Sequence, residues 1–282
     1  MRAEADGAAA EARDRALTRM TSLFPDVYND PMQWPLCRLL LPHQRALLMH
    51  TFPDSATGRS ATLLNSAANF LQASGDAAGA LPLYRRALDS QERVLGMEHP
   101  DTLVSVNNLA GCTRALGDAA GALPLYRRAL DSSESVIGTE HPNALSSVDN
   151  LAGCMQALGD AAEALPLFRR ALDGRERVLG TDHPDTLISI NNLAYCMQAL
   201  GDAAGALPLY RRALDSCEGV LGTEHPETLI RVNNLALCLW ALGDAAGALP
   251  LCRRAVNGFD SLFGPDHPSS QTVRANCDQL ER

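Results

Sequence analysis

The sequence predicts an all-α protein built from stacked helical repeats, and three observations support this fold class. The segment GDAAGALPLYRRALDS begins at Gly75 and returns at equal intervals, nearly letter for letter, from Gly117, Gly159, Gly201 and Gly243, which defines a 42-residue period. A fixed period of about 20 to 50 residues is typical of repeat arrays. Hydrophobic residues make up 46% of the chain but aromatic residues only 5%. With Ala and Leu abundant, this composition favours closely packed helices.

The residues before the regular repeats predict a helical N-terminal cap over residues 1–57. Residues 1–24 are rich in Ala and Arg and predict a helix with a frayed start, followed by a loop at FPDVYNDP. Residues 34–52 carry leucines at helical spacing, and Pro42 is expected to kink this helix or divide it in two. Because Trp34 lies one full period before Asp76, this segment corresponds to the second helix of a degenerate repeat.

Each regular copy predicts two helices separated by glycine stops. The first helix opens with His99-Pro100-Asp101, where proline suits the first helical position and aspartate the positive end of the helix dipole. Gly117 suits a left-handed C-terminal position, and Asp118 then caps the second helix. We therefore expect five repeats and a C-terminal capping helix, with boundaries at 58–99, 100–141, 142–183, 184–225, 226–267 and 268–282.

A proline lies about six residues into every second helix. It removes one backbone hydrogen bond, so we expect either a kink or a helix whose regular part begins later. These prolines are Pro82, Pro124, Pro166, Pro208 and Pro250. The surrounding alanines, such as Ala110, Ala122 and Ala129 of one copy, predict close helix packing around one ring per copy. The rings belong to Tyr84, Tyr126, Phe168 and Tyr210.

The charged residues argue against a nucleic-acid partner. The formal net charge is -9 at pH 7, and every basic side chain is arginine because the chain has no lysine. Phosphate recognition requires a concentrated basic face. The paired arginines of each repeat could form such a face, but in four copies an aspartate follows the first arginine at i+4, as Asp89 follows Arg85. A solvated, self-paired helix face is the favoured interpretation.

Two periodic columns of possible metal ligands are also better explained by structure. Cys112, Cys154, Cys196 and Cys238 recur at the period, as small apolar core residues with reduced thiols would. Histidines recur from His99 to His267, but equivalent positions two helices apart are separated by about 16 to 20 Å, far too much for one ion. We predict capping histidines, with no metal, cofactor or catalytic set. The chain shows no signal peptide and no membrane span, so we expect a cytoplasmic protein.

The repeated residues resemble a known family. The Leu-Ala, Gly-Asp, Ala, Tyr, Ala order resembles the tetratricopeptide repeat (TPR) in its 42-residue form, over residues 58–282. NNLAGCTRALGDAAGALPLYRRAL is similar to the TPR array of kinesin light chains, including the proline in the second helix. The same repeat form follows NB-ARC-type ATPase modules in bacteria, and WPLCRLLLPH at residues 34–43 resembles the segment that joins such a module to its repeats. The resemblance implies a right-handed α-solenoid whose first helices line a concave peptide-binding face.

Two features of those relatives are missing. Without lysine, a GxxxxGK[ST] phosphate-binding loop is impossible, so the chain carries no nucleotide-hydrolysing module of that kind. Residues 1–57 hold no sustained heptads, so the coiled coil of kinesin light chains is missing as well.

The candidate partner-binding residues follow one stripe of the first helices. An amide both donates and accepts, so Asn65, Asn107, Asn191 and Asn233 are predicted to hold the backbone of an extended peptide. Asp149 occupies this column in the third repeat. The alternative is that these amides only tie one repeat to the next, a role for which the neighbouring Asn108, Asn150, Asn192 and Asn234 look better suited.

The residues four and seven positions further on share this stripe and differ most between copies. Those predicted to contact the ligand are Asn69, Arg114, Tyr195, Leu237 and Trp240. Gly111 and Gly153 leave room for a bulky ligand group, while Tyr195, Leu237 and Trp240 predict a binding hot spot. For Trp240, burial against the helix over 268–280 is an equal alternative.

These residues predict a non-enzymatic scaffold that binds an extended segment of a partner protein. The alternative function is a truncated or detached sensor or regulatory arm of an NB-ARC-like signalling ATPase, working on a module in another chain. We expect a monomer without nucleic-acid or membrane partners, although near-identical repeats could stack end to end where a cap is weak.

Overall fold

A computed structural model describes residues 2–24, 33–51 and 58–280, and all its regular elements there are α-helices. None of the described helices is long and apolar enough to cross a membrane. The bounds are α1 Arg2–Leu23, α2 Trp34–Thr51, α3 Gly58–Ala73, α4 Ala77–Val94, α5 Pro100–Ala115, α6 Ala119–Ile137, α7 Pro142–Ala157, α8 Ala161–Leu179, α9 Pro184–Ala199, α10 Ala203–Leu221, α11 Pro226–Ala241, α12 Ala245–Phe263 and α13 Pro268–Leu280. The predicted loop at FPDVYNDP lies outside the described residues, apart from Phe24.

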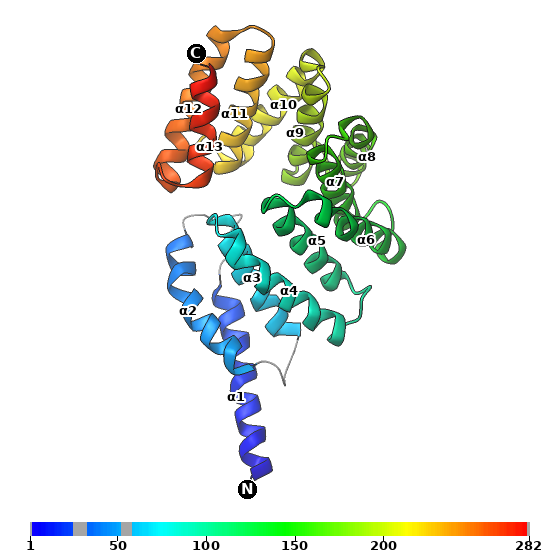
Figure 1. The fold of residues 1–282 in the computed structure, drawn as a ribbon, viewed down its shortest axis with the longest axis vertical. Helices are drawn as coiled ribbons and strands as arrows, with labels where there is room; N and C mark the ends of the chain where they lie inside the picture. The colour runs from blue at the N-terminus through cyan, green and yellow to red at the C-terminus, as the bar shows by residue number, and fades with distance from the viewer. Residues whose placement is uncertain (1, 25–32, 52–57, 281–282) are drawn as a thin grey trace. The chain divides into compact units, whose positions relative to one another are not determined.

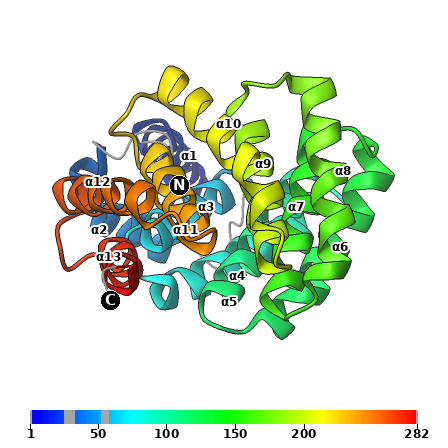
Figure 2. The same cartoon turned by 90° about the horizontal axis from the view of Figure 1, so that it is seen from above.

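The chain forms two compact units, residues 1–136 and 137–282. From α1 to α5 in the first unit, and from α7 to α13 in the second, helices that follow one another in the sequence lie side by side. Figure 1 shows this for α3 and α4 in the first unit, and for α11, α12 and α13 in the second. The turned view in Figure 2 keeps α11 and α12 beside each other. In each repeat we call the helix after His-Pro the first helix and the helix after Gly-Asp the second.

The helix boundaries follow the capping signals in the sequence. His99 lies before α5, and its Nδ1 accepts a hydrogen bond from the Asp101 backbone N–H at 3.1 Å, as the equivalent histidines of the later repeats do. Gly117 ends the turn after α5 with φ at +90°, a conformation that L side chains rarely adopt. The Asp118 carboxylate then accepts from the Gly121 N–H at 2.8 Å. The predicted capping roles of histidine and aspartate are confirmed.

The second helices of the repeats and helix α2 continue through their prolines without a break. Pro82 lies inside α4, which begins at Ala77 directly after its cap Asp76, so the later helix start considered from the sequence is wrong. The hydrogen bond that Pro82 cannot donate would reach Ala78 in the first turn, and the Asp76 cap already holds that turn. Pro42 likewise lies inside the single helix α2, so the predicted division of that segment into two helices is wrong.

The small residues and rings form the core as predicted. Ala110, Ala122, Ala129 and the rings of Tyr84, Tyr126, Phe168 and Tyr210 are buried. All eight cysteines are buried, and none forms a disulfide bond. Cys112, Cys196 and Cys238 donate from Sγ to backbone carbonyls at the start of the preceding second helix, at 3.2 to 3.3 Å. Burial raises the pKa of each of these thiols, which keeps them protonated.

Replacing Ala194 by leucine is expected to destabilise the second unit by overpacking. Ala194 is fully buried in a cluster with Ala206 and Tyr210, so a larger side chain must displace its neighbours. The free energy of unfolding, measured by urea denaturation, should fall by about 1 to 3 kcal/mol. Ala199→Leu, on an exposed position of the same helix, is the matched control and should cost much less.

Candidate partner-binding face

The predicted amide column lies at the junction between neighbouring first helices. Asn65 donates to Ser105 Oγ at 2.6 Å, from α3 to α5. Asn234 donates to Asn191 Oδ1 at 3.0 Å, from α11 to α9. Asn233 is only 7% exposed, and its Oδ1 accepts from Asn276 of α13 at 3.4 Å. These amides therefore tie repeats together, as the alternative from the sequence described. Asn107 of the same column is half-buried in α5.

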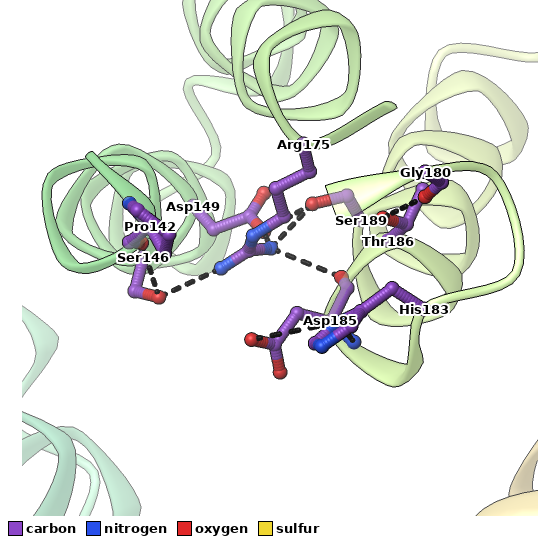
Figure 3. Close-up of polar contacts among 9 residues, drawn as sticks. All are labelled: Pro142, Ser146, Asp149, Arg175, Gly180, His183, Asp185, Thr186 and Ser189. Carbon is purple, nitrogen blue, oxygen red and sulfur yellow. Dashed lines mark hydrogen bonds and ion pairs between the residues drawn. The ribbon is translucent and has the colours of Figure 1, made fainter. Parts of the chain in front are cut away.

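In the third repeat the column holds a buried ion pair instead of an amide bond. Asp149 of α7 contacts the Arg175 guanidinium of α8, and their side chains are only 4% and 5% exposed (Figure 3). The same guanidinium donates to Ser146 Oγ at 2.8 Å and to the Asp185 carbonyl at 3.2 Å. Ser189 of α9 donates to Asp149 Oδ2 at 2.6 Å. Arg175 thereby joins α7, α8 and α9 in one network.

The positions equivalent to Asp149, Arg175 and Ser189 form a neutral network two periods earlier in the sequence. There Asn65 donates to Ser105, and Ser105 donates to Gln91, which stands two periods before Arg175 in the sequence. An Asp/Arg pair thus replaces an Asn/Gln pair, and the serine that joins each pair comes from the first helix of the next repeat. Sequence reasoning missed Arg175, because its column holds a different residue in every copy and only Asp149 departs from a repeated residue.

The electrostatics of this cluster fit a structural role. Burial raises the pKa of Asp149, while the Arg175 charge and the Ser189 hydroxyl oppose that rise. With the guanidinium directly on Oδ2, the carboxylate and the arginine form a charge-compensated pair inside the stack. Such a pair leaves neither group available to a ligand.

The next column of the stripe faces the buried rings of the second helices. Tyr84 donates from its hydroxyl to Asn69 Oδ1 at 2.7 Å, so Asn69 supports the core. A Cβ at Gly111 would lie 3.4 Å from the Tyr126 hydroxyl, so the space beside this glycine is bounded by that ring. Leu237 is half-buried against the core of the second unit, whereas Arg114 at the end of α5 is exposed.

Two of the predicted ligand contacts are exposed aromatic side chains. Tyr195 of α9 is 56% exposed and Trp240 of α11 is 37% exposed, so neither side chain is fully buried. Ile188 and Ile230 are exposed on the same two helices, seven residues before Tyr195 and Leu237. Positions i and i+7 share one side of a helix. We call these five residues of α9 and α11 the apolar face: Ile188, Tyr195, Ile230, Leu237 and Trp240.

The paired arginines lie on the second helices, where ion pairs run from repeat to repeat. Arg128 contacts Glu92 at 2.6 Å in the first unit. In the second unit Arg212 contacts Glu176 at 2.7 Å and Arg254 contacts Glu218 at 2.6 Å. The sequence predicted pairing within a helix, whereas in these three pairs the second arginine links neighbouring second helices. No group of three possible metal ligands occurs among the described residues.

Stacked helix-turn-helix units of this kind define a helical-repeat protein. The tetratricopeptide repeat model matches residues 59–135, 142–219 and 187–249, and a second tetratricopeptide repeat model matches residues 103–179. The chain therefore belongs to the TPR family.

Solved structures with similar folds include kinesin-light-chain-like TPR proteins. A protein of Podosopora anserina, described as a putative kinesin light chain with nearly identical TPR-like repeats, is 27% identical with a TM-score of 0.55, over 70% of this chain and 94% of that one. BtubC (BKLC) of P. vanneervenii is 24% identical with a TM-score of 0.60, over 84% of this chain and 93% of that one. A Rap protein in complex with competence and sporulation factor is 16% identical with a TM-score of 0.59, over 89% and 71%. A comparison with curated proteins finds no significant match.

Proposed function

We propose that this protein is a non-enzymatic scaffold that binds an extended segment of a partner protein along its first helices. The observation that carries the proposal is the exposure of two large aromatic side chains, Tyr195 and Trp240, on the apolar face of the second unit. Burying such side chains supplies much of the binding energy at protein interfaces. A Rap protein of the same fold binds competence and sporulation factor, so the fold is compatible with holding a partner.

The amides keep a secondary role in this proposal. Asn191 uses its Oδ1 to accept from Asn234, so its Nδ2 is the group that would donate to a ligand carbonyl. Asn233 is mostly buried and would act by fixing the surface. In the first unit, Asn65 and Asn69 hold Ser105 and Tyr84 in place. Asn107 and the exposed Arg114 are the groups of α5 that we assign to a ligand there.

The test is a selection of linear peptides from a random display library on the full chain. Selected peptides should lose at least about thirtyfold in affinity for Tyr195→Ala/Trp240→Ala, because truncating a hot-spot residue costs about 2 kcal/mol or more. Val220→Ala removes an equally exposed apolar side chain from the second helix α10 and should leave binding unchanged. Selected peptides that bind the double variant as tightly as the wild type would show that the apolar face is not the site. Circular dichroism of each variant checks the fold.

A further inference from the structure

We infer that the segment bound on the apolar face is cationic, with apolar residues flanked by Lys or Arg. This inference rests on the proposed function, because it specifies the chemistry of that partner. It is carried by the charges that surround the apolar face and by the two aromatic rings within it.

The accessible charge on the first helices of the second unit is negative. The charged residues of α7, α9 and α11 are Asp149, Asp185, Glu227 and Arg231. Asp149 and Arg231 are buried, each in an ion pair. Asp185 and Glu227 remain partly exposed at the start of α9 and α11, three residues before Ile188 and Ile230. Of these two carboxylates, only Glu227 forms an ion pair with a guanidinium group. A ligand that crosses the N-terminal ends of these helices therefore meets carboxylates.

The opposite ends of the same helices are also negative. Asp160, Asp202 and Asp244 are exposed in the turns that directly follow α7, α9 and α11. Asp202 and Asp244 each accept one backbone hydrogen bond through Oδ1, at 2.8 and 2.9 Å. The apolar face thus lies between two rows of carboxylates.

Three arginines nearby in the sequence are engaged elsewhere. Arg212 and Arg254 pair with Glu176 and Glu218 between second helices, and Arg274 of α13 pairs with Asp260 of α12 at 2.5 Å. Arg211 of α10 is exposed, and its charge opposes the rise that burial causes in the pKa of Cys238 on α11. On α7, α9 and α11 the single basic residue is the buried Arg231. No accessible base on these three helices offsets the carboxylates.

The aromatic rings favour the same partner. The face of a tyrosine or tryptophan ring attracts ammonium and guanidinium groups. The turn after α11 folds back on the helix end, because Gly243 donates to the Trp240 carbonyl at 2.8 Å and Asp244 donates to the Leu239 carbonyl at 2.9 Å. Asp244 therefore follows the last helical turn of α11 closely. An acidic segment would meet like charges at both ends of the face.

The test repeats the peptide selection at low salt and then compares the charges of the selected peptides and the salt dependence of their affinity. Peptides that depend on Tyr195 and Trp240 should contain more Lys and Arg than Asp and Glu, and their affinity should fall in high salt. Asp185→Asn/Asp202→Asn should weaken these peptides by about three- to tenfold, as the loss of two exposed ion pairs does. Asn143 naturally stands at the position equivalent to Asp185, and asparagine caps helices as well as aspartate does, so the variant should fold.

The matched control is Asp173→Asn/Asp215→Asn, which removes two exposed carboxylates from the second helices α8 and α10. It changes the net charge equally and should leave affinity unchanged. Equal losses in both double variants, or neutral or acidic selected peptides, would overturn the inference while leaving the proposed function standing. A library that yields no peptide dependent on Tyr195 and Trp240 would overturn both.

Discussion

Replacing Arg175 by glutamine is expected to lower the free energy of unfolding by about 3 to 5 kcal/mol, because Asp149 then remains as a buried charge without its partner. The substitution also removes the hydrogen bonds from Arg175 to Ser146 and to the Asp185 carbonyl, so the contacts among α7, α8 and α9 weaken together. Urea denaturation followed by circular dichroism measures the change.

The control for this variant exists within the chain itself. The first repeat holds asparagine and glutamine at the two equivalent positions, around an equivalent serine. Asp149→Asn/Arg175→Gln should therefore recover most of the stability, because replacing both members of a buried ion pair is often nearly neutral. If the double variant is as unstable as Arg175→Gln alone, the loss comes from packing and not from the uncompensated charge.

Replacing Tyr210 by alanine is expected to cost about 3 to 5 kcal/mol, the usual range for removing a buried aromatic ring. The ring is fully buried in the core of the second unit, where it packs with Ala206, Leu229 and Cys238. The midpoint of urea denaturation should fall well below that of the wild type. A loss below about 1 kcal/mol would mean that the surrounding helices collapse into the space.

Two phenylalanine variants separate the ring from its hydroxyl. The Tyr210 hydroxyl has no hydrogen-bond partner among the described residues, and the third repeat carries Phe168 at the equivalent position. Tyr210→Phe should therefore be neutral or stabilising. Tyr84→Phe removes the bond to Asn69 and should cost about 0.5 to 1.5 kcal/mol. Equal effects in the two variants would contradict this assignment of the hydroxyls.

The helices and their caps were predictable because their signals are local. His-Pro pairs, Gly-Asp turns and left-handed glycines each act within a few residues, and their repetition made every one visible five times. The effect of the prolines in the second helices was harder to predict. The sequence shows which hydrogen bond Pro82 removes, but it does not show that the Asp76 cap holds the first turn of the helix.

The candidate site was only partly predictable, because the sequence gives side-chain spacing along a helix but not which helix a side chain meets. Tyr195 and Trp240 were identified from their departure from the other copies, and both are exposed. The amides of the same stripe were assigned to a ligand, whereas Asn65, Asn191 and Asn233 bond to neighbouring repeats. One helix face supplies both roles, and a small rotation around the helix axis decides between them.

The sequence by itself determined that this chain is a TPR protein with a 42-residue period, because period, capping and alanine packing are properties of the chain order. Only the tertiary structure decided which polar residues are free. Asp149 and Arg175 lie on different helices, and they meet because α8 packs between two first helices. Burial, which sets whether a polar group binds a ligand or a neighbour, is a property of that packing and not of the chain order.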